Sequence, residues 1–283
     1  MTADLDQALR AATARLGAAG ITEPYREARI LLAAAIGADQ AGLLRRRGGD
    51  LTTEEAKRFD SMVARRGLRI SAAHVIGHRE FWSLDFRVTE DTLVPRPDSE
   101  VLIETALELR PERDAIRSIL DLGTGSGCLL LAALSEYRGA WGLGIDLSPR
   151  AAAVARGNAT ALGLAGRAAI AVGRWTDALS GRFDLLLCNP PYIPAADIAE
   201  LMPEVGLHEP RLALDGGVDG LDPYRLLFAG LPQRLTPAGL ALFEFGIGQA
   251  EPLQALAEAS GLVVVACRAD LGGHPRVLAV SHR

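Results

Sequence analysis

The residue types best suited to chemistry in this sequence follow an apolar stretch at 183–188. Phe-Asp-Leu-Leu-Leu-Cys has the pattern of a buried strand, and Asn189, Pro190, Pro191 and Tyr192 come directly after it. Neither proline has an N–H to donate, so the strand must end here, but the Pro190 carbonyl can still accept a hydrogen bond. This carbonyl and the Asn189 side-chain oxygen could accept the two hydrogens of a substrate NH2 group, while the Tyr192 ring lies against a flat amide or base. Taken alone, the tetrapeptide could also be a proline-rich turn that ends a strand.

A glycine-rich loop lies earlier in the chain, between an apolar stretch at 118–122 and a helical pattern. It consists of Gly123, Thr124, Gly125, Ser126 and Gly127. The glycines let the backbone turn tightly and approach a ligand, and the N-terminus of the next helix presents N–H groups with partial positive charge. A dinucleotide fingerprint would need a glycine at the sixth position of this pattern, which is Cys128. The spacing therefore disfavours NAD.

An aspartate at the end of the next apolar stretch could bind a ribose. Asp146 follows residues 141–145, and a carboxylate at such a strand end can accept hydrogen bonds from both ribose hydroxyls. An isolated aspartate before a helix is more often only its N-cap. The loop and the acid together favour a nucleoside ligand with a short charged tail. Open α/β sheets bind ligands beyond the carboxyl ends of their strands, so we expect the glycine loop, Asp146, Trp175 and Asn189 to converge on one crevice.

The second part of the chain carries the pattern of the sheet that would position these residues. Strand-like stretches alternate with helical ones, which predicts parallel strands with helices on both faces. Two further stretches, 262–268 and 276–281, are too close in sequence for a crossover helix, so we expect them to pair as an antiparallel hairpin. The fold class is therefore predicted as α/β, with a doubly wound, mostly parallel seven-stranded sheet. The five strands expected before the hairpin are 118–122, 141–145, 168–172, 183–188 and 239–245.

The first part of the chain has a helical period. Apolar residues recur at helical spacing over 4–20 and 24–37, and Thr52 with Glu55 has the spacing of a capping box that opens a third helix. No constellation of catalytic residue types occurs there. We therefore expect a small N-terminal helical domain at 1–73 that packs against the rest or docks substrate.

A change of period near residue 76 predicts a connecting element. Residues 80–88 alternate between apolar and polar side chains, 89–91 has turn residues, and 92–94 could run back as a strand. This pattern predicts a β-hairpin linker at 74–96, followed by a catalytic domain at 97–283 that opens with a helix capped by Asp98 or Ser99.

Composition excludes several classes of function. A net charge of −5 and an isoelectric point near 5.6 disfavour a protein that coats nucleic acid, although arginines cluster at 45–47 and 65–66. No uncharged apolar run reaches the roughly 18 residues of a membrane span, and the N-terminus has no secretory signal, so we expect a cytoplasmic protein with no membrane contact. Cys128, Cys188, Cys267 and the five histidines show no ligand spacing, so no metal site is predicted.

The motifs together resemble the class I S-adenosylmethionine-dependent methyltransferases that act on an amide or exocyclic nitrogen. This resemblance is carried by Asp-Leu-Gly-Thr-Gly-Ser-Gly at 121–127, by Asp146 and by Asn-Pro-Pro-Tyr at 189–192. The flanking sequences closely resemble the release factor glutamine methyltransferases, the PrmC or HemK family, over nearly the whole chain. They are Glu-Phe-Trp-Ser-Leu at 80–84, Leu-Val-Pro-Arg-Pro-Asp-Ser-Glu at 93–100 and His-Glu-Pro-Arg-Leu-Ala-Leu-Asp-Gly-Gly at 208–217.

The resemblance implies a methyl donor, a substrate and roles for the residues that match. S-adenosylmethionine would lie against residues 123–127, Asp146 and Trp175, and Asn189 would touch both donor and substrate. Residues 189–192 would hold the glutamine of the Gly-Gly-Gln motif of peptide chain release factors, with Asn189, Pro190 and Tyr192 as catalytic residues. The resemblance implies no direct nucleic acid contact, and we expect a monomer.

One departure from the family pattern concerns the donor site. Arg174-Trp175 stands where the family usually has Asp-Trp, and arginine has no hydrogen-bond acceptor for a donor amino group. Asp177 or backbone groups could supply that contact instead.

Two alternatives to the release factor reading stay open from the sequence. A DNA adenine or cytosine amino-methyltransferase would share the Asn-Pro-Pro-Tyr motif, and a non-catalytic S-adenosylmethionine-binding protein would share the donor loop. The sequence shows no plain basic recognition domain that would favour the first alternative, and the second would not need residues 189–192.

Overall fold

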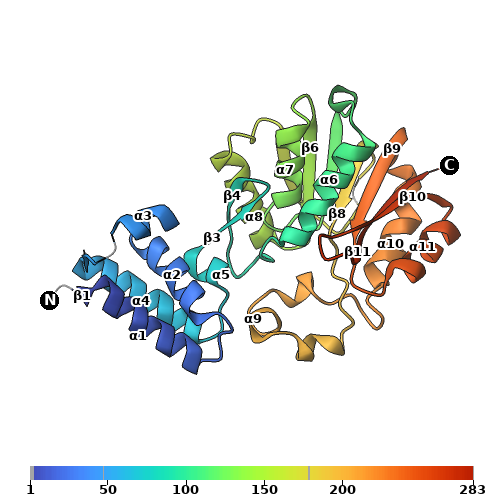
Figure 1. The fold of residues 1–283 in the computed structure, drawn as a ribbon. Helices are drawn as coiled ribbons and strands as arrows, with labels where there is room; N and C mark the ends of the chain where they lie inside the picture. The colour runs from blue at the N-terminus through green and yellow to red at the C-terminus, as the bar shows by residue number, and fades with distance from the viewer. Residues whose placement is uncertain (1–2, 47, 178, 283) are drawn as a thin grey trace. The chain divides into compact units, whose positions relative to one another are not determined.

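The computed structural model describes residues 3–46, 48–177 and 179–282. The chain divides into two compact units (Figure 1). Unit 1 comprises Met1–His78 together with Met202–His208, and unit 2 comprises Arg79–Leu201 together with Glu209–Arg283.

Unit 1 is built from helices, as its apolar period predicts. Helices α1, α2 and α4 contact one another around a buried aliphatic core, in which Leu16, Leu31 and Leu32 are fully buried. The elements of this unit are β1 (Ala3–Asp4), α1 (Leu5–Ala18), α2 (Pro24–Ala35), α3 (Gln40–Arg45), β2 (Asp50–Leu51), α4 (Thr53–Gly67), α5 (Ala72–Ile76) and α9 (Pro203–Gly206).

The capping box predicted at the start of α4 is confirmed. The Thr52 hydroxyl accepts a hydrogen bond from the Glu55 backbone N–H, and the Glu55 carboxylate accepts one from the Thr52 backbone N–H at 2.8 Å. Two otherwise unsatisfied donors of the helix N-terminus are thereby paired.

Ion pairs within unit 1 hold the short segment Met202–His208. The Arg66 side chain, 5% exposed, donates to Glu27 and to Glu204, each at 2.9 Å. Arg69 donates to the second carboxylate oxygen of Glu204 at 2.7 Å. A buried arginine needs such partners, because an unpaired buried charge is strongly destabilising.

The predicted β-hairpin exists, but its turn lies elsewhere. Strands β3 (His78–Phe81) and β4 (Leu84–Arg87) are joined by Trp82 and Ser83, not by the predicted turn at 89–91, and 92–94 forms no strand. Both turn residues have left-handed backbones, with φ of 53° and 57°. Two-residue hairpin turns usually use glycine or asparagine for this conformation, so the sequence carried no turn signal here. Trp82 is held by hydrogen bonds from its backbone N–H to Glu100 and from its ring N–H to Glu136.

Unit 2 contains the predicted seven-stranded sheet, in the order β10-β11-β9-β8-β5-β6-β7. Strands β9, β8, β5, β6 and β7 pair in parallel, and β11 is antiparallel to both β9 and β10, as predicted for the final hairpin. The bounds are β5 (Ser118–Leu122), β6 (Trp141–Asp146), β7 (Ala168–Val172), β8 (Phe183–Cys188), β9 (Leu235–Glu244), β10 (Leu262–Ala269) and β11 (Pro275–His282). The chain winds outward from β5 to β7 and then returns to place β8 on the other side of β5. This point of reversal is where open α/β sheets bind ligands.

Helices cover both faces of this sheet and create two separate apolar cores. Alternate residues of β8 belong to different cores: Leu185 and Leu187 pack with α6 and α7, while Leu186 and Cys188 pack with α10 and α11. A strand that is buried on both faces reads as a continuous apolar run, which explains the pattern at 183–188. The helices are α6 (Glu100–Leu109), α7 (Cys128–Glu136), α8 (Pro149–Ala161), α10 (Asp222–Gly230) and α11 (Ala250–Ala259). Short 3-10 turns are η1 (Pro97–Ser99), η2 (Arg113–Ala115), η3 (Asp197–Glu200), η4 (Arg211–Ala213) and η5 (Leu231–Gln233).

None of the helices in the described part of the chain combines the length and apolar character that a bilayer span requires.

Candidate functional site

A cavity of about 860 Å³ opens at the carboxyl ends of the parallel strands of unit 2. Its volume lies within the range of small-molecule sites. The loops after β5, β6, β7 and β8 all contribute to its wall, so the predicted convergence of four distant sequence signals is observed. The predicted site residues that line it are Gly123, Thr124, Gly125, Ser126, Asp146, Trp175, Asn189 and Pro191.

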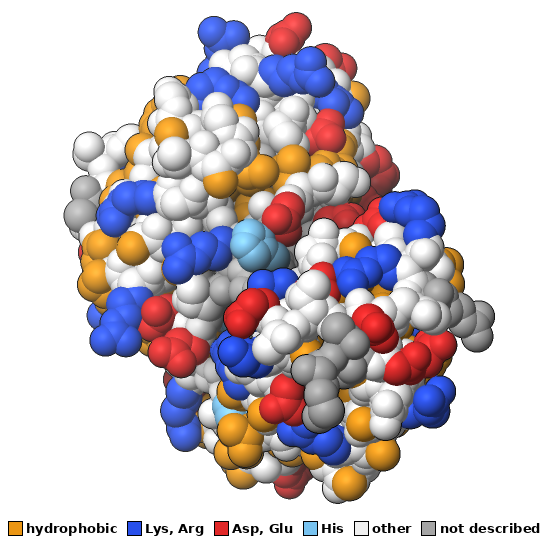
Figure 2. Space-filling view, turned by 90° about the vertical axis from the view of Figure 1, so that its left-hand side faces the viewer, with side chains coloured by type: hydrophobic (Ala, Val, Ile, Leu, Met, Phe, Trp, Pro, Cys, Tyr) orange, Lys and Arg blue, Asp and Glu red, His pale blue; other side chains and the backbone are white. Residues whose placement is uncertain are grey.

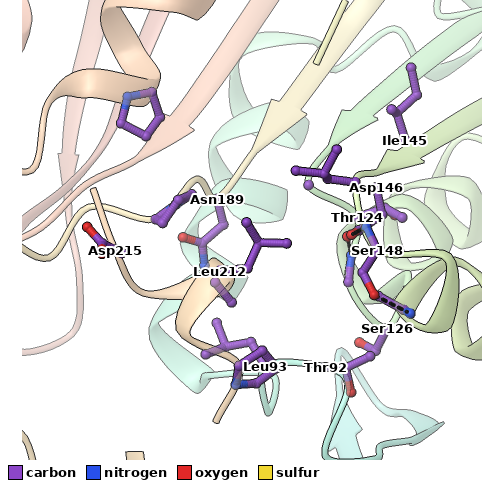
Figure 3. A pocket seen from close by; sticks show the side chains of 18 of the residues that line it. Thr92, Leu93, Thr124, Ser126, Ile145, Asp146, Ser148, Asn189, Leu212 and Asp215 are labelled. Atoms are coloured by element: carbon purple, nitrogen blue, oxygen red, sulfur yellow. Dashed lines mark hydrogen bonds between the residues drawn. The ribbon is translucent and has the colours of Figure 1, made fainter. Parts of the chain in front are cut away.

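Two sides of the cavity carry different residues (Figure 3). Thr124, Asp146 and Ser148 lie on one side, and Asn189 and Leu212 lie across the open space from them. The first side belongs to the glycine loop and the end of β6, and the second belongs to the segments that follow β8 and precede α10. This arrangement therefore suits two ligand molecules, one against each side of the cavity.

Asp146 is held by two backbone N–H groups. Its Oδ2 accepts from Gly125 and its Oδ1 from Ser148, both at 2.8 Å. Burial raises the pKa of Asp146, and these two hydrogen bonds oppose the shift. Each carboxylate oxygen keeps a lone pair in addition to the one used here, so Asp146 can also accept hydroxyl hydrogens from a ligand in the cavity.

Glycine is needed at positions 123 and 127 of the loop for different structural reasons. Gly123, at φ 73°, lies against the Trp175 ring, and a Cβ there would come 3.6 Å from that ring. Gly127, at φ 83°, does not line the cavity; a Cβ would lie 3.2 Å from Ala155 of α8 and 3.3 Å from Leu131. Gly127 therefore lets α7 begin close to α8, and its neighbours in the loop face the cavity.

Asp121 lies beneath the glycine loop. In the sequence it stood out only as the first residue of the motif at 121–127. It is 1% exposed, and its Oδ2 accepts from the Thr124 hydroxyl at 2.6 Å. Burial raises the pKa of Asp121 to about 7. Among the described residues, Asp121 Oδ1 and the Ser126 hydroxyl are buried polar atoms without a hydrogen-bond partner. Ser126 lines the cavity and Asp121 does not, so of these two groups it is the Ser126 hydroxyl that fits a polar ligand, because buried polar groups are rarely left unpaired.

Trp175 and Arg174 follow β7 at the edge of the cavity. Trp175 has a left-handed backbone, with φ of 48°, and its ring is partly buried against the apolar core next to α10 and α11. Arg174 lines the cavity and is exposed, whereas Asp177 is exposed and is not among the lining residues. Asp177 is thus in no position to replace the missing aspartate through a direct contact in this structure.

The Asn189 side chain is fixed by a serine far away in the sequence. Its Nδ2 donates to the Ser99 hydroxyl at 3.2 Å, across a separation of 90 residues. Ser99, one of the two residues predicted as the cap, is the N-cap of α6, but its side chain makes no capping hydrogen bond. With Nδ2 engaged in this way, the Asn189 Oδ1 remains available as an acceptor.

Pro190 and Tyr192 are not among the residues that line the cavity. Pro190 is buried, and the Tyr192 ring packs against the core of buried residues beneath α10 and α11. The Tyr192 hydroxyl donates to Glu244 at 3.4 Å, and the Tyr192 carbonyl accepts from the Gln249 side chain at 2.9 Å. Burial raises the pKa of Tyr192. In this structure Tyr192 supports the motif from within, so stacking on a substrate would require its ring to move.

A buried ion pair that sequence reasoning missed joins two walls of the cavity. Arg96, from the segment before α6, donates to Glu209 at 2.6 Å, and the Glu209 side chain is fully buried. Burial raises the pKa of Glu209, and Arg96 opposes the shift. Glu209 is buried and is paired with Arg96, which is partly exposed. This ion pair therefore anchors the segment that carries Leu212. The only sequence signal was that both residues lie in stretches that carry the family resemblance.

No group of three or more metal-ligating side chains gathers anywhere in the described parts of the chain. The three cysteines are unpaired thiols, and burial raises the pKa of Cys128 to about 12. This thiol therefore stays protonated near neutral pH.

Comparisons with protein families divide the chain in two. Residues 7–77 match the family described as the PrmC N-terminal domain, and residues 97–205 match the one described as the methyltransferase small domain. A protein of Rhodospirillum rubrum named release factor glutamine methyltransferase is 48% identical over 95% of this chain and 82% of its own length. A protein of the same name from Bradyrhizobium diazoefficiens is 47% identical over 97% of this chain and 93% of its own length.

Solved structures resemble the fold at low sequence identity. The hMettl16 catalytic domain, solved in complex with MAT2A 3'UTR hairpin 1, has a TM-score of 0.57 and 17% identity, covering 83% of this chain and 86% of that one. A methyltransferase from Pyrococcus furiosus has a TM-score of 0.52 and 16% identity, covering 70% of this chain and 88% of that one. At these identities the likeness concerns the fold alone.

Proposed function

The chain belongs to the family of release factor glutamine methyltransferases, and we propose that it methylates the glutamine of the Gly-Gly-Gln motif of a peptide chain release factor. The methyl group would go from S-adenosylmethionine to N5 of that glutamine. The observation that carries this proposal is the 47–48% identity with two such proteins over at least 95% of the chain. A cytoplasmic location and a role in translation termination go with the same proposal.

The glycine-loop side of the cavity fits the methyl donor. S-adenosylmethionine supplies a methyl group on a positively charged sulfur, together with a ribose and an amino acid tail. Asp146 has lone pairs for the ribose hydroxyls, and the unpaired hydroxyl of Ser126, a residue that lines the cavity, is suited to a polar group of the tail. The acidic side chains here also favour a cationic ligand. We propose residues 123–127, Asp146, Trp175 and Asn189 as the donor site.

The opposite side of the cavity supplies acceptors for a substrate amide. A carboxamide nitrogen is a poor nucleophile because its lone pair is delocalised into the carbonyl. We propose that Asn189 Oδ1 and the Pro190 carbonyl accept its two hydrogens and favour the pyramidal, positive nitrogen of the transition state. Such hydrogen bonds accelerate the reaction because they are stronger in the transition state than in the ground state. Holding both reactants in line could contribute on the order of 7–11 kcal/mol more.

No strong general base is needed in this mechanism. The amide nitrogen becomes acidic once it is methylated and loses its proton readily. We propose that Asn189, Pro190, Pro191 and Tyr192 bind the glutamine side chain, with Tyr192 acting from the buried side of the motif. The helical region at 1–73 stays our proposed docking domain for the release factor, and we expect the enzyme to act as a monomer.

Methyl transfer from labelled S-adenosylmethionine to purified release factor tests this function. The matched substrate is the same factor with the motif glutamine replaced by glutamate, and duplex DNA is offered beside it. Label on the glutamine protein alone is the expected result. Label on DNA would replace the substrate and keep the donor site. Donor binding with label on neither would favour the binding-only alternative.

The DNA alternative has less support from the surface. Figure 2 shows Lys and Arg side chains interspersed with Asp and Glu side chains on the face that it draws. Interspersed charges of both signs do not form the continuous basic track that binds a nucleic acid backbone. The net charge of −5 points the same way.

A further inference from the structure

Arg96 lines the cavity in the segment that precedes α6. Its backbone carbonyl accepts from the Ser99 backbone N–H at 3.1 Å, and the Ser99 hydroxyl accepts from Asn189 Nδ2 at 3.2 Å. Leu93, from the same segment, lies on the same side of the cavity as Asn189 (Figure 3). One short turn therefore connects Arg96 with the residue proposed to bind the substrate amide.

The Arg96 guanidinium is held through one of its nitrogens. Its Nη2 donates to Glu209 Oε1 at 2.6 Å, and the Glu209 side chain is fully buried, whereas the Arg96 side chain is 37% exposed. A guanidinium carries five N–H donors in a planar fork. Within the described residues, Glu209 is the one hydrogen-bond partner of this guanidinium. Its other N–H groups are therefore available to a ligand in the cavity.

A second arginine on this side of the cavity is already engaged. Arg211, next to Leu212, donates from Nε and from Nη2 to Asp215 Oδ2, at 3.2 and 3.1 Å. Its side chain is 69% exposed, so its position is less constrained than that of Arg96. Arg96 therefore combines a fixed position with free donors.

The motif Gly-Gly-Gln offers little but backbone next to the glutamine. Glycine has no side chain, so a protein can bind these two residues through hydrogen bonds only at their backbone N–H and C=O groups. The Arg96–Glu209 pair has no net charge when the carboxyl is ionised, and this offsets its attraction for an anion such as the carboxylate of the methyl donor. The free N–H groups can still donate to a neutral carbonyl.

We propose that Arg96 binds a backbone carbonyl of the peptide beside the target glutamine, and that Glu209 is the positioning residue that holds Arg96 for this contact. This inference rests on the proposed function, because it assigns a substrate contact within the same reaction. A guanidinium that is already fixed by a buried carboxylate loses less side-chain freedom when substrate binds, so the contact contributes more to affinity.

Arg96→Lys tests the contact while keeping the ion pair. Lysine can still pair with Glu209, but its compact ammonium cannot reach Glu209 and the substrate at two separate edges as a guanidinium does. We expect R96K to raise the KM for the release factor about 10-fold, the loss expected for one hydrogen bond from a charged donor. Because the contact is the same in ground state and transition state, kcat should stay within about twofold. The Kd for S-adenosylmethionine should not change.

Arg268→Lys is the matched control. Arg268 has nearly the same side-chain exposure, 38%, and it also pairs with a glutamate that is distant in sequence, Glu108. Neither residue lines the cavity, so R268K should leave the KM for the release factor unchanged. If R96K has the same KM as R268K, Arg96 is only a structural partner of Glu209 and the proposal is wrong. A higher Kd for S-adenosylmethionine with an unchanged KM for the factor would assign Arg96 to the donor and would also overturn it.

Glu209→Gln tests the positioning role and keeps the experiment informative if R96K does not fold. Glutamine can still accept from Arg96 but has no charge, so the guanidinium is held less firmly. E209Q should raise the KM for the release factor severalfold with little change in kcat, whereas E108Q should not. Equal KM values for E209Q and E108Q would refute the role of Glu209. Absence of methyl transfer by the unaltered enzyme would instead refute the proposed function, so the two failures are distinguishable.

Discussion

Asp146 accepts a hydrogen bond from the backbone N–H of Gly125, with 2.8 Å between Oδ2 and the nitrogen. This contact ties the end of β6 to the glycine loop after β5, so that one carboxylate both shapes the loop and faces the cavity. Asparagine at position 146 would turn an NH2 group toward one of the two backbone N–H groups that now donate hydrogen bonds to the carboxylate. The loop and the donor contacts should therefore weaken together.

We expect Asp146→Asn to raise the Kd for S-adenosylmethionine about 10-fold or more, which is the loss expected for a charged hydrogen bond of roughly 1.5–3 kcal/mol. Isothermal titration calorimetry measures this Kd directly. Asp177→Asn is the matched control, because Asp177 is exposed and does not line the cavity. Equal affinities of D146N and the unaltered protein would contradict the role given to Asp146.

Asn189→Ala should separate catalysis from donor binding. It removes the amide oxygen proposed to stabilise the transition state, and loss of one such group typically costs 100- to 1,000-fold in kcat, so we expect about that reduction. The Kd for S-adenosylmethionine should change much less. Single-turnover methylation and calorimetry on the same preparation measure the two quantities, and undiminished turnover would refute the assignment.

Gly220→Ala should disturb Tyr192. Gly220 has a φ of 77°, and a Cβ there would lie 2.2 Å from the Tyr192 carbonyl oxygen and 2.4 Å from the Gln249 side-chain nitrogen. Gly261 has a similar φ of 79° with nothing within 4 Å of an added Cβ, so Gly261→Ala is the matched control for backbone strain. Each substitution should lower the free energy of unfolding by about 1–2 kcal/mol from the left-handed backbone. Only G220A should also lower kcat; equal kcat values for the two variants would contradict a role for the Tyr192 position.

Thr52→Ala should destabilise unit 1 by removing half of the capping box. Loss of a threonine N-cap costs about 1 kcal/mol. Thr53→Ala is the control one residue later, on the exposed first turn of α4. Urea unfolding of both variants measures the difference, and a T52A protein as stable as T53A would show that the box contributes nothing.

The free energy of unfolding should depend on pH through Glu244, because burial raises the pKa of this carboxyl to about 7 from an ordinary value of 4.5. Because the folded state holds the Glu244 proton more tightly than the unfolded chain does, stability falls as pH rises from about 4.5 to about 7. E244Q should show a shallower fall, measured by urea unfolding at several pH values. A steeper fall in E244Q would mean that Glu244 is not protonated in the folded state.

Sequence patterns predicted the central strands of the sheet because β5, β8 and most of β9 are buried on both faces. The apolar run at 183–188 corresponds to β8 residue for residue, and the prolines mark its end. The convergence of the glycine loop, Asp146, Trp175 and Asn189 could also be predicted, because the carboxyl ends of parallel strands share one edge.

Other features depended on contacts that no local pattern contains. Ser99 has the position of a helix cap, yet its hydroxyl accepts from Asn189 across 90 residues. Glu244 ends a strand that is otherwise read only as an apolar run, and it accepts hydrogen bonds from the hydroxyls of Tyr192 and Tyr224, which come from two distant segments. The turn at Trp82 and Ser83 uses left-handed residues of types that rarely adopt this conformation, so its place depended on hydrogen bonds to Glu100 and Glu136.

The assignment of Met202–His208 to unit 1 has a consequence for protein engineering. The boundary between the units falls at three places in the chain, after residues 78, 201 and 208. A chimera that exchanges only the first 78 residues with those of a relative would keep Glu204 but bring foreign partners in place of Arg66 and Arg69. Exchange of unit 1 between family members therefore has to include both Met1–His78 and Met202–His208. We expect recombination between relatives to succeed only where these two segments are inherited together.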